Sequence, residues 1–159
     1  KKSIEKDVEW SLSQEDPNPN NAHRYVYSPT SLEVETAKNP ISQEKVVMVD
    51  AINHALNEEM DLNPKMIIYG QDIADPKGGV FTATKGLSSK YGKDRVFNSP
   101  LAESSIIGTA VGLAVTGYKP VVEIQFADYI WTSMMQIRNE VVTMRYRSNN
   151  LWELSLIHI

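Results

Sequence analysis

The segment from Arg95 to Tyr129 constrains the fold most, because two strand-like runs in it enclose a helix of small residues. The first apolar run ends at Ser99-Pro100, and Glu103 follows at the start of the predicted helix 104–116. Gly117 and Pro120 then lead into a second apolar run, residues 121–126. In open α/β sheets, ligands gather where strands end and helices begin. The sequence therefore places the candidate chemistry around Glu103.

Periodicity on both sides continues the alternation of strands and helices. Apolar residues at helical spacing precede the Asn63-Pro64 stop, and a short apolar run at 66–70 is typical of a buried parallel strand. The remaining predictions are a helix at 86–91, strands at 95–98 and 121–126, and helices at 104–116 and 131–147. This order predicts an α/β fold, with a mostly parallel sheet covered by helices on both faces and truncated by the end of the chain.

The chain divides into four segments by composition. Its 159 residues suit one domain with a tail. Residues 1–15 have a helix-like period and are expected to be the tail of a preceding module, and 16–41 form a linker rich in Pro, Asn and Ser. The domain is expected at 42–153, incomplete at its C-terminus.

The last segment, 154–159, reads Leu-Ser-Leu-Ile-His-Ile. A common sequencing adapter gives these residues when it is translated in frame, and a short natural strand would look the same. We favour the adapter, because the segment continues no visible pattern. His158 is therefore given no functional weight.

Composition excludes several classes of function. The net charge is −4 and the basic residues form no run, so nucleic-acid binding has no electrostatic footprint. The chain has no Cys, which excludes disulfides, thiolate metal sites and Cys nucleophiles and fits a cytoplasmic protein. No apolar stretch is long enough to span a membrane, so no membrane partner is expected.

Glu103 has two possible explanations from the residues alone. With Ser99 as the cap and Pro100 first in the helix, Glu103 lies four residues on, whereas a capping box needs three. The helix dipole alone would favour an acid there. Its apolar neighbours instead suggest a partly buried carboxyl, suited to binding a ring nitrogen or moving a proton. Both explanations stay open at this point.

Two glycines, Gly108 and Gly112, lie inside the predicted helix 104–116. Glycine destabilises a helix interior relative to alanine, so their presence needs a reason. One reason is close approach to a neighbouring backbone or a cofactor. The other is packing against a helix of another subunit.

About a hundred residues resemble a known family in order and spacing. The shared motifs are Asp50-Ala51-Ile52-Asn53, Gly79-Val80-Phe81, Thr84-Lys85-Gly86-Leu87, the run from Tyr91 to Glu103 that ends Pro-Leu-Ala-Glu, the run Glu123-Ile124-Gln125-Phe126-Ala127-Asp128-Tyr129, and Arg145-Tyr146-Arg147-Ser148. Together they resemble the β-subunit half of the thiamine-diphosphate-dependent E1 component of 2-oxoacid dehydrogenase complexes. Residues 24–29 are similar to the join in bacterial E1 proteins whose α and β halves are fused.

The resemblance implies a transketolase-like pyrimidine-binding domain and a set of site residues. Glu103 would be the catalytic acid that hydrogen-bonds N1′ of the aminopyrimidine of thiamine diphosphate. The backbone of Leu101, the side chain of Gln125 and the ring of Tyr129 would lie along the same ring. Tyr129 could instead be an ordinary core aromatic, and Gln125 could be purely structural.

The resemblance also implies partners. The full enzyme would decarboxylate a 2-oxo acid and pass the acyl group to the lipoyl domain of an E2 component. An α-type half would hold Mg²⁺ and the diphosphate, a second β-type half would complete the assembly, and this chain would supply no metal ligand. The sequences of residues 93–98 and 124–129 are more similar to those of branched-chain enzymes than to those of pyruvate enzymes, so a branched-chain 2-oxo acid is favoured. Transketolase-type enzymes and a non-catalytic binding or oligomerisation domain of the same fold are the alternatives.

Two departures from the family pattern stand out. Many relatives carry an acid after the strand glycine, where this chain has Gln71, which puts a proton-network role at that position in doubt. Relatives often have Pro-Ala-Phe-Asp-Gln where this chain has residues 132–136, Thr-Ser-Met-Met-Gln. That surface is expected to face another subunit, so partner contacts there can differ.

Overall fold

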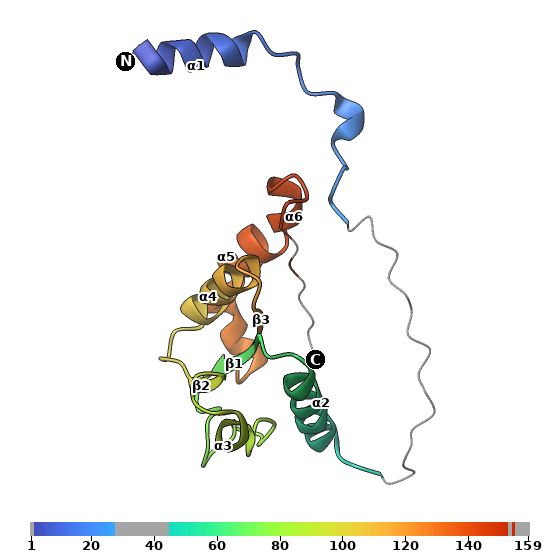
Figure 1. The fold of residues 1–159 in the computed structure, drawn as a ribbon, viewed down its shortest axis with the longest axis vertical. Coiled ribbons are helices and arrows are strands. Elements are labelled where there is room, and N and C mark those ends of the chain that lie inside the picture. Colours follow the sequence, from blue (N-terminus) through green and yellow to red (C-terminus); the bar gives the residue numbers. More distant parts are fainter. Residues whose placement is uncertain (1, 28–44, 153, 155–159) are drawn as a thin grey trace.

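A parallel three-stranded sheet lies at the centre of the domain (Figure 1). The computed structural model describes residues 2–27, 45–152 and 154. The strands are β1 (Met66–Gly70), β2 (Val96–Asn98) and β3 (Lys119–Glu123), in the order β2-β1-β3. Gly70 pairs with Asn98 on one side and with Glu123 on the other, so all three strands end at the same level.

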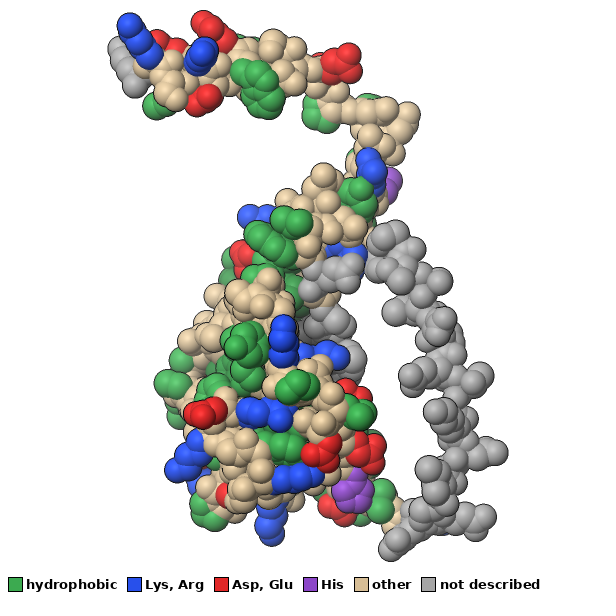
Figure 2. Space-filling view, viewed as in Figure 1, with side chains coloured by type: hydrophobic (Ala, Val, Ile, Leu, Met, Phe, Trp, Pro, Cys, Tyr) green, Lys and Arg blue, Asp and Glu red, His purple; other side chains and the backbone are tan. Residues whose placement is uncertain are grey.

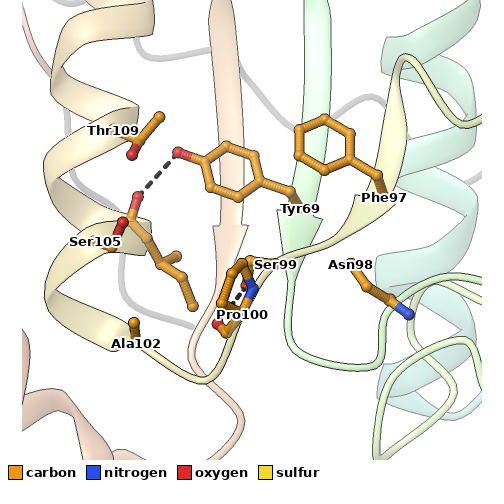
Figure 3. Close-up of a pocket in the computed structure, with 9 residues that line it drawn as sticks. Tyr69, Phe97, Asn98, Ser99, Pro100, Ala102, Ser105 and Thr109 are labelled. Carbon is orange, nitrogen blue, oxygen red and sulfur yellow. Dashed lines mark hydrogen bonds between the residues drawn. The ribbon is translucent and has the colours of Figure 1, made fainter.

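Helices cover both sides of this sheet, which confirms the predicted α/β class. Helix α2 (Met48–Leu62) contacts β1, α3 (Leu87–Tyr91) contacts β2, and α4 (Glu103–Val115) packs along β3. Figure 3 shows α4 on one side of the strands and α2 on the other. Two further helices precede the sheet, α1 (Lys2–Leu12) and the 3₁₀ turn η1 (Pro19–Asn21).

The hydrophobic core lies largely between the sheet and helices α2 and α3. It comprises Met60, Met66, Ile68, Ile73, Leu87 and Val96. On the α4 side, Ile106 and Ile107 are buried. The hydroxyl of Tyr69 donates to the carbonyl of Ile106 at 2.9 Å, which ties α4 to β1. Burial raises the pKa of Tyr69 to about 12, so this phenol stays a donor at physiological pH.

Arg95 joins the C-terminal end of α2 to the sheet. Its guanidinium donates to the carbonyls of Met60 at 3.1 Å and Asn63 at 2.7 Å, and to that of Met66 at 3.1 Å. The group also lies over the ring of Tyr91, 5.3 Å from its centroid. Helix ends leave carbonyls without intrahelical partners, and one rigid cation satisfies several acceptors here.

The sequence prediction for the last strand is wrong in its bounds. The last strand is Lys119–Glu123 rather than 121–126, because β1 ends opposite Glu123 and later residues have no strand to pair with. Pro120 lies within β3 rather than before it. A proline lacks a backbone donor, and it is tolerated because β3 is an edge strand among the described residues.

The single helix predicted at 131–147 is also wrong. The structure has a series of short pieces instead: the 3₁₀ segment η2 (Ala127–Ser133), α5 (Met134–Gln136), the π-helical segment η3 (Ile137–Val141) and α6 (Met144–Arg147). Hydroxyl side chains bond backbone carbonyls near two of the breaks: Thr132 donates to Tyr129 at 2.9 Å, and Thr143 to Asn139 at 2.6 Å. Such local bonds compete with regular helical ones.

Much of the predicted linker 16–41 and of the segment 154–159 lies outside the described residues. Among the described residues, no helix is long and apolar enough to cross a membrane. On the face shown in Figure 2, acidic and basic side chains of the domain are interspersed.

Asp75 organises the loop between β1 and α3. Its carboxylate accepts hydrogen bonds from the backbone N–H of Gly86 at 2.7 Å and of Ser89 at 2.9 Å. The hydroxyls of Ser89 and Ser88 also donate to it, at 2.6 and 2.8 Å. These bonds, led by that of the Ser89 hydroxyl, hold the pKa of Asp75 well below its ordinary value.

We expect Asp75→Asn to lower the free energy of unfolding by about 1–3 kcal/mol, because donors to the carboxylate lose their acceptor. The lowered folded-state pKa means that this stabilisation is present above the ordinary value of 3.8 and is lost as the pH falls below it. Urea unfolding at about pH 6 and about pH 3 should show a smaller difference between variant and wild type at the lower pH. The exposed Asp94→Asn is the matched control. Equal effects of the two substitutions would contradict the assignment.

Candidate functional site

Glu103 is the first residue of α4, at the edge of the sheet where the strands end. The preceding loop is held to β1 because the N–H of Ser99 donates to the carbonyl of Gly70 at 2.8 Å. Ser99 does not cap the helix as the sequence suggested, since the N-cap is Ala102 and has no side-chain cap. The Ser99 hydroxyl instead donates to the carbonyl of Pro100 at 3.2 Å.

Two neutral side chains hold the carboxylate of Glu103. Its Oε1 accepts from Nε2 of Gln71 at 3.0 Å. Its Oε2 lies 3.3 Å from Oγ1 of Thr132, whose single hydroxyl proton it shares with the carbonyl of Tyr129 at 2.9 Å. The residue is half-buried, as expected from its apolar neighbours. The pKa of Glu103 lies below its ordinary value, chiefly because of its own backbone N–H and then the Gln71 amide, while burial opposes the shift. The group is therefore a fixed, ionised acceptor at neutral pH.

Gln71 connects three parts of the edge. It follows β1 directly and is only 8% exposed. Its carbonyl accepts from Nε2 of Gln125 at 3.1 Å, which ties the segment after β3 to the end of β1. Among the described residues, Gln71 is thus the one residue that links Gln125 to Glu103 through hydrogen bonds.

Tyr129 lies in η2, close to the same network. Its carbonyl accepts from the Thr132 hydroxyl, the group that also faces Glu103. Its ring is 46% exposed and packs edge-on against Phe126, with centroids 5.4 Å apart. Phe126 packs in the same way on Phe81 at 5.8 Å. Tyr129 is therefore not an aromatic residue of the hydrophobic core. Leu101, the other predicted contact with an exposed side chain, is 83% exposed.

A second carboxylate at this edge, Glu123, received no role from the sequence. It ends β3 and is half-buried, and burial raises its pKa. A Cβ on Gly79 would lie 3.2 Å from its Oε2, and the positive φ of Gly79, 84°, is a left-handed conformation that favours glycine. The sequence pattern that could have identified Glu123 was an acid at the end of an apolar strand.

A small cavity of about 200 Å³ lies between α4 and the ends of β1 and β2 (Figure 3). It is lined by Tyr69, Phe97, Asn98, Ser99, Pro100, Ala102, Ser105, Ile106 and Thr109. The rings of Tyr69 and Phe97 stack at 5.3 Å along one wall. Glu103, Gln125 and Tyr129 do not line this cavity, so the candidate site lies outside it.

The parallel sheet and the helices that cover it define an α/β domain, with Glu103 at the start of α4 where the strands end. The family model described as "Transketolase, pyrimidine binding domain" matches residues 44–156. The chain belongs to this family.

Relatives of the chain are β subunits of 2-oxoacid dehydrogenases. This chain is 45% identical over 109 residues to the 2-oxoisovalerate dehydrogenase subunit beta of Bacillus subtilis. The match covers 69% of this chain and 33% of that protein. The mitochondrial 2-oxoisovalerate dehydrogenase subunit beta of Dictyostelium discoideum is 43% identical, covering 81% of this chain and 34% of the relative. The pyruvate dehydrogenase E1 component subunit beta of Bacillus subtilis is 42% identical, with coverages of 68% and 33%. The chain thus spans about a third of the length of these curated relatives and carries an E1 β-type domain.

We expect Thr132→Val to raise the pKa of Glu103, because the carboxylate loses one of its hydrogen-bond donors. The carboxyl pKa can be followed by ¹³C NMR titration of the labelled protein. Thr132→Ser keeps the hydroxyl and is the matched control. A pKa of Glu103 that is the same in the Val and Ser variants would show that the hydroxyl donates only to Tyr129.

Proposed function

We propose that this chain is the pyrimidine-binding part of a thiamine-diphosphate-dependent E1 component that acts on a 2-oxo acid. The observation that carries the proposal is the carboxylate of Glu103, ionised and held by Gln71 and Thr132 at the edge where the strands end.

The residues at this edge fit an aminopyrimidine. Glu103 offers a charged acceptor to a ring nitrogen that carries a proton. Tyr129 and Leu101 expose apolar surface beside it, which suits the faces of a planar ring. Gln125 is held by its bond to Gln71, so its amide is positioned rather than free. We assign Glu103 as the catalytic group and Leu101, Gln125 and Tyr129 as cofactor contacts.

In this proposal the protein sets protonation and orientation. Bound thiamine diphosphate would supply the carbanion chemistry that removes CO₂ from a 2-oxo acid. Glu103 holds a proton at the ring nitrogen, and its low pKa keeps the carboxylate available as the acceptor.

Substrate and partners follow the relatives. The names of two relatives specify 2-oxoisovalerate, and that of a third specifies pyruvate at a similar identity. We favour a branched-chain 2-oxo acid as substrate and the lipoyl domain of an E2 component as acyl acceptor. An α-type half would hold Mg²⁺ and the diphosphate, and a second β-type half would complete the oligomer. Pyruvate is the second candidate substrate.

In the full-length protein assembled with its partners, Glu103→Gln should reduce 2-oxo acid decarboxylation by about a hundredfold or more. The amide has the size of the carboxyl but cannot carry its charge. The circular dichroism spectrum should stay unchanged. Glu58→Gln, on the exposed face of α2, is the matched control and should retain full activity. Normal turnover by the Glu103 variant would remove this residue from the mechanism and favour a non-catalytic domain of the same fold.

Substrate choice is tested by comparing kcat/KM for 3-methyl-2-oxobutanoate and pyruvate in the same assembled protein. We expect the branched substrate to be preferred by about tenfold or more, since each additional buried methyl group contributes to transition-state binding. A preference for pyruvate would establish the second candidate.

A further inference from the structure

The Gln71 amide is held in one place at the sheet edge. The residue is 8% exposed, and its backbone is fixed by the end of β1 and by the hydrogen bond from Gln125. Its Nε2 lies 3.0 Å from Oε1 of Glu103. A side chain that is buried and anchored in this way limits how the carboxylate beside it can turn.

The chemistry of the amide sets the state of Glu103. An amide donates through nitrogen and accepts through oxygen. With nitrogen toward Glu103, the bond is made to an ionised carboxylate, and the amide itself does not titrate. A carboxyl of the same shape at position 71 would face Glu103 at hydrogen-bond distance, and two such acids cannot both ionise.

We propose that Gln71 is a positioning residue that holds Glu103 as a purely accepting group toward the aminopyrimidine, through a neutral hydrogen bond rather than a proton shared between two acids. This inference rests on the proposed function. It makes the identity of residue 71 the determinant of how the site responds to pH.

Among the described residues, no titratable side chain replaces Gln71 as the hydrogen-bond partner of Glu103. The titratable and charged groups on the elements that pack around Glu103 are Tyr69 in β1 and Asp72 after it, Lys119 and Glu123 in β3, Asp128 and Tyr129 in η2, and Arg138 and Glu140 in η3. In the described part of the chain, none of these side chains hydrogen-bonds Glu103. Asp72 pairs with Lys77 at 2.8 Å. Hydrogen bonds and burial, not these charges, set the pKa of Glu103.

The test compares Gln71→Glu and Gln71→Met with wild type in the full-length, assembled protein. Thiamine diphosphate affinity is measured by calorimetry across pH, together with kcat/KM for the 2-oxo acid. In Gln71→Glu, the acidic limb of both profiles should move up by about one pH unit or more, because the paired acids share a proton. In Gln71→Met, which keeps volume but has no donor, affinity should fall roughly tenfold or more.

Gln14→Glu, the same exchange in the exposed segment that follows α1, is the matched control and should leave both profiles unchanged. Thermal unfolding of each variant separates loss of fold from loss of positioning. A Gln71→Glu profile that coincides with wild type, or Gln71→Met affinity within twofold of it, would overturn the inference while leaving the role of Glu103 intact. Failure of the wild-type assembly to bind thiamine diphosphate would instead overturn the proposed function, and this inference with it.

Discussion

The parallel register of three strands is the constraint on which the candidate site depends. Because Gly70 pairs with both Asn98 and Glu123, the strands stop together, and the segments that follow them meet at one edge. Gly70, the last residue of the middle strand, must be a glycine, since a Cβ there would lie 2.8 Å from the carbonyl oxygen of Glu123. A larger residue would push β3 away and separate Gln125 from the backbone of Gln71.

Much of this arrangement could be predicted from local pattern. The apolar run at 66–70 and the small-residue helix up to 115 are both where periodicity indicated, because each has a stop signal of its own. The end of β3 could not be predicted, since it is set by where a neighbouring strand stops. The broken helix after Phe126 was missed for a related reason: its apolar spacing fits a helix, while hydroxyl groups bond its carbonyls.

The site was predictable in part. Glu103 could be singled out because an acid among apolar residues at a helix start is unusual enough to need a reason. Its donors could not be assigned that way. Gln71 and the segment with Thr132 stood out only as departures from the family pattern, and both are distant from Glu103 in sequence. The two carboxylates at the edge show how environment separates equal groups: donors lower the pKa of Glu103, and burial raises that of Glu123.

The helix type changes along η2, α5 and η3, so the two residues that hold Glu103 lie on elements of different local stability. Gln71 follows strand β1, which is paired on both sides, whereas Thr132 lies in a 3₁₀ segment that is followed by a three-residue α-helix and a π-helical segment. Segments of that kind open locally at lower free energy than strands do. Local unfolding should therefore begin in the segment from η2 to η3, where amide hydrogens should exchange with solvent first. The amides of strand β1, next to Gln71, should stay protected.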